Sequence, residues 1–171
     1  LEATGSGGLI VDSDLSNSGL IWADGGNITI NGAVTGSGTA LINGATLEFS
    51  GTSSANVAFE DGNFGTLVLD NPITYTGQIS GFGGGIGSQN SDSIELKGIV
   101  FDAGTSWTYS DNAGSDTGGT LTIFETVDGT KNAVNSLTFA DGDYTTANFV
   151  LGSDGNGGTL ITDTPTVETP S

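Results

Sequence analysis

The sequence predicts an all-β fold, most simply a right-handed parallel β-helix, on three observations. Short bursts of β-branched, Leu or aromatic residues, bounded by Gly, Asn, Asp, Ser or Thr, recur from residue 20 to residue 162. Several bursts echo one another, as in Gly65–Asp70, Gly119–Phe124 and Gly158–Asp163, which all begin Gly-Thr-Leu. No eleven-residue window has helical apolar spacing free of glycine. Such repeated strand–turn units bury their apolar faces by stacking on one another.

Apolar residues alternate with small or polar ones in each expected strand. This period of two is the pattern of a strand with one buried face. In chain order the expected strands are Ile28–Ile30, Thr46–Phe49, Val57–Phe59, Ser93–Leu96, Trp107–Tyr109, Leu121–Ile123 and Leu137–Phe139.

The turns decide between a β-helix and the alternative, a β-sandwich. A sandwich would use Asn-Gly or Asp-Gly hairpin turns. The motif Ile-Asn-Gly-Ala at residues 30–33 returns at residues 42–45, which we interpret as equivalent corners of stacked coils. With two strands and about 20 residues in each coil, the chain would form roughly seven to eight coils.

Residues 1–163 are expected to form a single β-solenoid domain. Two glycine-rich or polar stretches, Gly81–Ser91 and Tyr109–Gly119, interrupt the strand pattern and are expected to be loops. Residues 164–171 have the Thr/Pro composition of a linker or tail.

Charge restricts the partners. Twenty Asp and Glu residues oppose two lysines, Lys97 and Lys131, and the formal net charge is −18. Nucleic acid is not an expected partner, because its binding requires a basic surface. Membrane insertion is not expected either, since no apolar run approaches the roughly 20 residues that span a bilayer.

The residue types that are missing restrict the chemistry. The chain has no Cys and no His, so disulfides, thiol nucleophiles, Ser-His-Asp triads and imidazole–zinc sites are excluded. A glycosidase could still be built from two carboxylates, for which Glu48, Glu60, Asp61 and Glu95 are candidates. Alternation places some of these on the solvent face of strands, so we do not expect an enzyme.

Calcium is the expected ligand if the chain binds an ion, although the fold requires no cofactor. Asp141 and Asp143, and likewise Asp154 and Asn156, place oxygen ligands two residues apart in glycine-rich turns, which suits a hard cation. The alternative is turn formation, in which these side chains bond their own backbone.

Trp107 and Tyr109 are the candidate ligand-binding residues. They are two residues apart on one expected strand, so both rings lie on one face and could stack against sugars. The alternative is that both rings fill the interior of the coil.

The sequence of residues 38–163 also resembles a known class of modules, which supports the β-helix prediction. The residues that carry the resemblance include Ala45–Phe49, Gly65–Asp70, Asp92–Leu96 and Ser153–Leu160. This stretch resembles parallel β-helix modules of bacterial secreted and surface proteins, of the autotransporter-passenger or repeats-in-toxin-associated adhesin type. Residues 83–92 also resemble one imperfect calcium-binding nonapeptide of the repeats-in-toxin type.

The resemblance implies a cellular location and a function. The location is outside a bacterial cell, either secreted or on the cell surface. The function is that of a structural or adhesive module that could self-assemble and be stabilised by calcium, with other copies or flanking domains as partners. The alternative is a module that binds or modifies carbohydrate, with glycans as partners.

Overall fold

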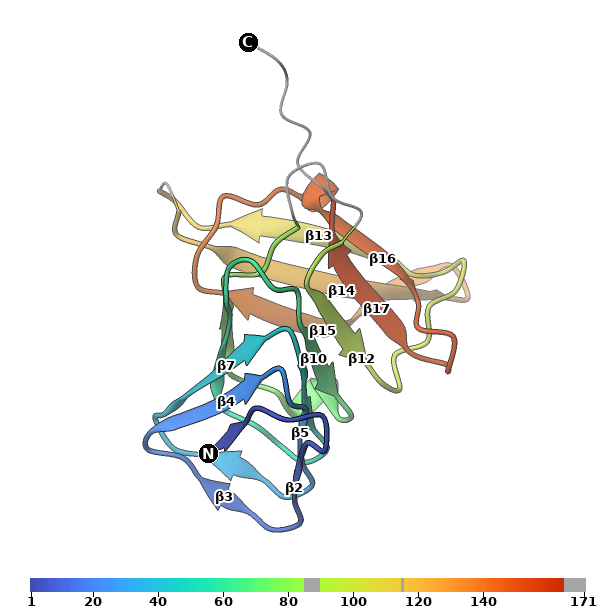
Figure 1. Ribbon diagram of the computed structural model, residues 1–171. Helices are drawn as coiled ribbons and strands as arrows, with labels where there is room; N and C mark the ends of the chain where they lie inside the picture. Colours follow the sequence, from blue (N-terminus) through green and yellow to red (C-terminus); the bar gives the residue numbers. More distant parts are fainter. Residues whose placement is uncertain (85–89, 115, 165–171) are drawn as a thin grey trace.

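The computed structural model describes residues 1–84, 90–114 and 116–164. Its strands form two large sheets and one small two-stranded sheet. The first strands stack as coils at one end of the molecule, and the strands from β13 onward cover the other end (Figure 1). We call β1 to β12 the coil stack and β13 to β17 the antiparallel cap.

Each coil of the stack contributes one strand to each large sheet, and every pairing between coils is parallel. The first sheet receives β1 (Glu2–Ala3), β4 (Leu20–Asp24), β7 (Thr39–Asn43), β9 (Asn56–Phe59) and β11 (Gln78–Ser80). The second sheet receives β2 (Leu9–Val11), β5 (Ile28–Ile30), β8 (Thr46–Phe49), β10 (Thr66–Leu69) and β12 (Ser93–Leu96). A narrow third side holds β3 (Leu15–Ser16) and β6 (Val34–Thr35), followed by single bridges at Ser53 and Tyr75.

The register confirms the predicted fold class. Leu9 lies beside Ile28 and Ile28 beside Leu47, so equivalent positions recur every 19 residues in the first coils. The stack is a parallel β-solenoid of about 4 turns. The expected seven to eight coils are therefore wrong, because parallel coiling ends after β12 and the rest of the chain forms antiparallel strands.

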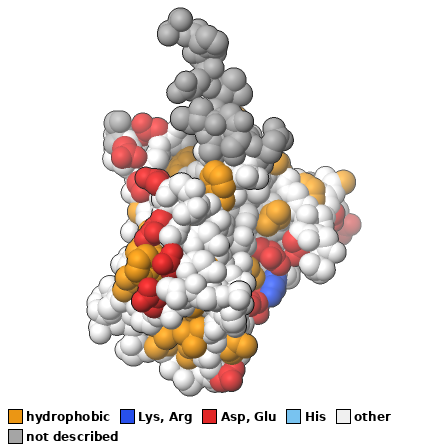
Figure 2. Space-filling model, in the orientation of Figure 1, with side chains coloured by type: hydrophobic (Ala, Val, Ile, Leu, Met, Phe, Trp, Pro, Cys, Tyr) orange, Lys and Arg blue, Asp and Glu red, His pale blue; other side chains and the backbone are white. Residues whose placement is uncertain are grey.

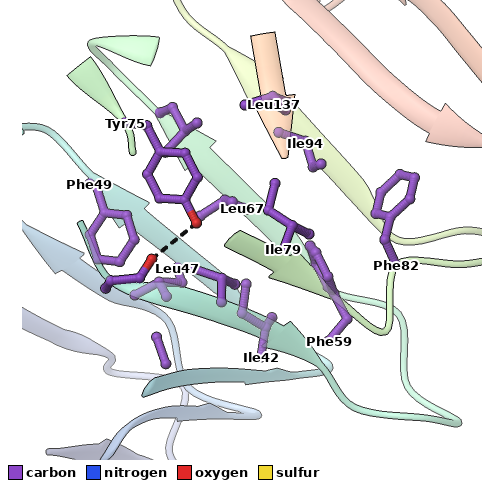
Figure 3. Close-up of a cluster of buried hydrophobic side chains, with 14 of the residues drawn as sticks. Ile42, Leu47, Phe49, Phe59, Leu67, Tyr75, Ile79, Phe82, Ile94 and Leu137 are labelled. Atoms are coloured by element: carbon purple, nitrogen blue, oxygen red, sulfur yellow. Dashed lines mark hydrogen bonds between the residues drawn. The ribbon is translucent and has the colours of Figure 1, made fainter. Parts of the chain in front are cut away.

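The interior of the stack is a set of apolar columns, one for each inward position of a strand. One column runs Ile28, Leu47, Leu67 and Ile94, all fully buried. Figure 3 shows Leu47, Leu67 and Ile94 of this column together with residues of the first sheet and the ring of Tyr75. The Tyr75 hydroxyl donates to the Ala55 carbonyl at 3.1 Å, so this buried polar group is satisfied.

The antiparallel cap extends both large sheets. Its strands are β13 (Ser106–Asp111), β14 (Gly119–Val127), β15 (Thr130–Phe139), β16 (Phe149–Ser153) and β17 (Thr159–Asp163). β15 pairs with β11 and continues the first sheet, whereas β17 pairs antiparallel with β12 and continues the second. Two short 3-10 turns, η1 (Pro72–Thr74) and η2 (Thr146–Asn148), are the helical elements of the described residues.

The chain reverses direction at Asp128-Gly129. Both residues have positive φ, 51° and 77°, and they connect β14 directly to β15. An Asp-Gly pair in this conformation is the preferred two-residue hairpin turn, because its twist matches that of the flanking strands.

The two Asn-Gly motifs are not equivalent corners, which corrects the interpretation from the sequence. Asn31 follows β5 in the second sheet, whereas Asn43 ends β7 in the first. Each one stacks on a residue 19 positions earlier: Asn31 donates to Asp12 and Asn43 donates to Asp24. The 12-residue spacing is thus the distance between two different corners of the chain, with the corner between β6 and β7 lying between them.

The expected loops and tail are only partly described. The connection from β13 to β14 begins after Asp111, so Tyr109 belongs to a strand, and Asn112 and Gly118 close the loop with a backbone hydrogen bond of 2.8 Å. Residues 85–89 of the first expected loop lie outside the described residues, and so does the linker assignment except for Thr164. The assignment of residues 1–163 to one domain stays a prediction.

Candidate functional site

The first expected calcium pair, Asp141 and Asp143, follows β15. The Asp141 carboxylate accepts the Gly81 N–H at 3.1 and 3.2 Å, and Asp143 accepts the Asp116 N–H. These carboxylates therefore bind backbone groups of two other loops. The contacts join the end of β15 to the coil stack and to the loop after β13.

The second expected pair, Asp154 and Asn156, lies in the turn between β16 and β17. The Asp154 carboxylate accepts N–H groups from Asn156 at 2.7 Å and Gly158 at 2.8 Å. These bonds hold the pKa of Asp154 below its usual value. The geometry is that of a side chain that stabilises its own turn.

No group of three or more His, Cys, Asp or Glu side chains in the described residues is arranged to hold a metal ion. The calcium assignment of Asp141, Asp143, Asp154 and Asn156 therefore stays a prediction.

Trp107 and Tyr109 lie on one face of β13, as alternation requires. The Trp107 indole Nε1 donates to the Phe149 carbonyl at 3.1 Å, and the Tyr109 ring packs 5.2 Å from the Phe149 ring. Trp107 also lines an open hollow of about 580 Å³ with Thr146, Ala147 and Phe149. Both rings are half-buried, so they contribute to packing while Trp107 keeps an edge on the hollow.

The candidate catalytic carboxylates fall in two places: Glu48 and Glu95 lie on the two strands that flank β10, and Glu60 and Asp61 line one cavity. Glu48 pairs with Lys97 at 2.5 Å, and Lys97 also contacts Asp70 at 2.7 Å. Burial alone would lower the pKa of Lys97, but the hydrogen bonds to Asp70 and Glu48 raise it above its usual value. Burial, helped by the charge of Asp154, raises the pKa of Glu95. Glu48 is thus engaged in an ion pair with one of the two lysines.

Sequence reasoning missed the most constrained carboxylates, Asp92 and Asp163. Asp92 accepts the Gly65 N–H at 2.9 Å and the Gly83 N–H at 3.1 Å, and Asp163 accepts the Gly84 N–H at 3.3 Å. Both residues are buried. They tie the segment after β11 to the coil stack and to β17. Asp92 stands 27 residues from Gly65, and no local pattern in the sequence signals this contact.

The environment of Asp92 changes its acidity. Burial raises the pKa of Asp92 to about 6, and the charges of Asp163 and Asp61 add to the rise, although the N–H groups of Gly65 and Gly83 oppose it. Burial also raises the pKa of Asp163. Asp92 lines a cavity of about 170 Å³ together with Glu60 and Asp61.

No protein-family model matches the chain, and no curated protein is similar enough in sequence to count as related. Among the described residues, no helix has the length and apolar character needed to cross a membrane.

Proposed function

We propose that this chain is a structural or adhesive module of a secreted or cell-surface bacterial protein. The observation that carries the proposal is the architecture: parallel coils stacked into a continuous apolar core, covered at one end by an antiparallel cap. A stack of this kind gives a rigid scaffold from short-range contacts alone. The cysteine-free composition and the charge of −18 suit a role outside the cell, where saline screens self-repulsion.

The first coil supports the self-assembly part of the proposal. Its strands β1, β2 and β3 are each paired on one side only within the described residues. Leu1 and Ile10 are exposed in this coil, Leu20 is exposed at the start of the next, and Figure 2 shows hydrophobic side chains at the lower end of the molecule. A sheet edge of this kind can pair with strands of another polypeptide.

Limited proteolysis with light scattering tests the structural role. We expect the folded chain to resist protease between β4 and β11, and scattering to report any growth of assemblies with concentration. Rapid cleavage within these coils under native conditions would contradict a rigid module.

Thermal unfolding in excess calcium and then in chelator, at fixed ionic strength, tests the stabilising role of the ion. A midpoint higher in calcium, and lost in Asp154→Asn, would support an ion site in that turn. Equal midpoints would leave the Asp residues as turn formers.

The alternative function is carbohydrate binding, and the hollow beside Trp107 is the observation that favours it. Trp107→Ala should then abolish binding to a glycan panel without unfolding the protein. If the wild-type chain binds no glycan of the panel, the carbohydrate-binding function is contradicted and the structural role is retained.

A further inference from the structure

β15 has a strand edge that the fold leaves open. The strand pairs with β14 along its whole length, but on its other side only Thr138 and Phe139 face β11. Among the described residues, no strand pairs with the Thr130–Leu137 stretch on that side, although η1 lies next to part of it and leaves the rest free. An edge of this length presents unpaired backbone groups to any polypeptide that approaches it.

Two hollows flank this edge, and both are bounded by Ile73 and Val134. One, of about 540 Å³, lies between the coil wall near Tyr75 and the strands β14 and β15. The other, of about 340 Å³, also contains Val100 and Val127 in its lining. Ile73 is 74% exposed, Val127 61% and Val100 55%. Exposed apolar residues gathered around one groove are typical of an interaction surface.

The edge also carries a β-bulge. Ile123 pairs with Asn135 and Phe124 with Ala133, so Val134 is the extra residue between them. A bulge bends its strand and redirects side chains, and bulges are frequent beside binding sites. The Asn135 amide nitrogen, on the lining of the larger hollow, is buried without an acceptor among the described residues. A bound polypeptide would bring carbonyl acceptors to this region.

Charge indicates what kind of polypeptide fits. Asp102 and Glu125 line the smaller hollow, whereas the nearby Lys131 lies over the Phe124 ring at 4.1 Å. Each copy of the chain carries −18, and Figure 2 shows carboxylates spread over the face in view, so a cationic partner is favoured at this surface over a second copy. A cationic strand would be attracted to the same surface.

We propose that the Thr130–Leu137 edge of β15, with the groove around Ile73 and Val134, docks an extended cationic strand of another protein. The strand adds to the first sheet beside β15 by main-chain hydrogen bonds. Its alternate apolar side chains enter the two hollows, and its basic residues face Asp102 and Glu125. In this mode of recognition the main-chain hydrogen bonds give most of the affinity, and the alternate side chains add specificity.

Fluorescence anisotropy of a labelled synthetic peptide, Lys-Thr-Val-Thr-Val-Thr-Val-Lys, tests the proposal. We expect saturable binding that Ile73→Ser weakens by about tenfold, because a buried contact of this size contributes roughly 1.4 kcal/mol. Val150→Ser is the matched control, since Val150 is an exposed valine of β16 outside the groove. It should bind the peptide as the wild type does.

Amide chemical shifts should locate the bound peptide at residues 130–137. A peptide with Glu in place of both Lys residues should bind more weakly at low ionic strength. The proposal is overturned by absence of binding, by equal binding in Ile73→Ser, or by equal binding of the Glu peptide. It is also overturned if the protein is a dimer that Ile73→Ser dissociates, because the groove would then be an interface between copies.

Discussion

The coil stack and the antiparallel cap are built from similar strand sequences but are held together differently. In the stack, one packing solution is repeated at each inward position, so that like residues form columns such as Ile28, Leu47 and Leu67. In the cap, Phe139, Phe149, Tyr109 and Tyr144 form a single aromatic cluster, and the Phe82 ring of the stack contacts its two phenylalanines. Stability in the stack is shared among neighbours, whereas stability in the cap depends on a few rings.

The largest effect is expected from Phe149→Ala. Phe149 is 2% exposed and its ring contacts those of Phe82, Tyr109, Phe139 and Tyr144, so its loss should cost about 3 to 5 kcal/mol of unfolding free energy. Chemical denaturation measures the loss. Val150→Ala, on the exposed face of the same strand, should cost less than about 1 kcal/mol. Equal costs for the two variants would show that the cluster does not hold the cap.

A somewhat smaller effect is expected from Leu47→Ala in the middle of the stack. Leu47 is fully buried between Ile28 and Leu67, so we expect a cost of about 3 kcal/mol. Hydrogen exchange should show lost protection in β5 and β10, with the cap little changed, because each coil contacts only its neighbours. Leu20→Ala, at a site 41% exposed, serves as the control. Uniform loss of protection across the chain would instead make stack and cap one cooperative unit.

Asn43→Ala should have a more modest effect, about 1 to 2 kcal/mol, measured by urea denaturation. Asn43 donates to Asp24 at 2.7 Å and accepts from Asn63 at 2.8 Å, so the variant removes two hydrogen bonds of one polar ladder. Asn156→Ala, in the exposed turn of the cap, should change the midpoint little. An unchanged midpoint for Asn43→Ala would mean that these hydrogen bonds form because the coils stack, and that they do not stabilise the stack.

The last effect concerns pH at the junction of the two regions. The pKa of Asp92 is raised in the folded protein to about 6 from 3.8, so the folded state holds the proton more tightly than the unfolded state. The stabilising contribution of this group is fully present below pH 3.8 and is lost as the pH rises through about 6.

Urea midpoints of wild type and Asp92→Asn, compared between pH 4 and pH 7, isolate this contribution from the other carboxylates. The difference in unfolding free energy, wild type minus variant, should fall as the pH rises. A constant difference would show that Asp92 ionises normally.

Local sequence predicted the strands but not the direction of their pairing. Thr46–Phe49 and Ser93–Leu96 are strands with the expected bounds, because alternation depends only on which face is buried. The three segments that begin Gly-Thr-Leu form β10, β14 and β17. β10 pairs parallel with both of its neighbours, whereas β14 pairs antiparallel with both of its neighbours. Pairing direction is decided by the connection between strands. In the sequence, the Asp128-Gly129 pair indicates the antiparallel connection between β14 and β15.

The candidate site was less accessible to prediction. The partners of Asp141 and Asp92 lie 60 and 27 residues away, so their hydrogen bonds follow from the tertiary arrangement. The face shared by Trp107 and Tyr109 followed from alternation, but the aromatic rings that surround Tyr109 come from other elements. The edge of β15 is open because β11 has only three residues, which no property of β15 itself reveals.

The 19-residue register of the early coils makes the length of such a protein countable. Asp24-Gly25 lies beside Asn43-Gly44, so a tandem copy of residues 25–43 inserted after Asn43 would join without changing either junction. Ile28 would stack on Ile28 and the Asn43 amide on another Asn43 amide. Each duplication would lengthen the rod by one strand spacing, about 4.8 Å. The length of the coil stack is therefore determined by the number of 19-residue repeats that the gene encodes.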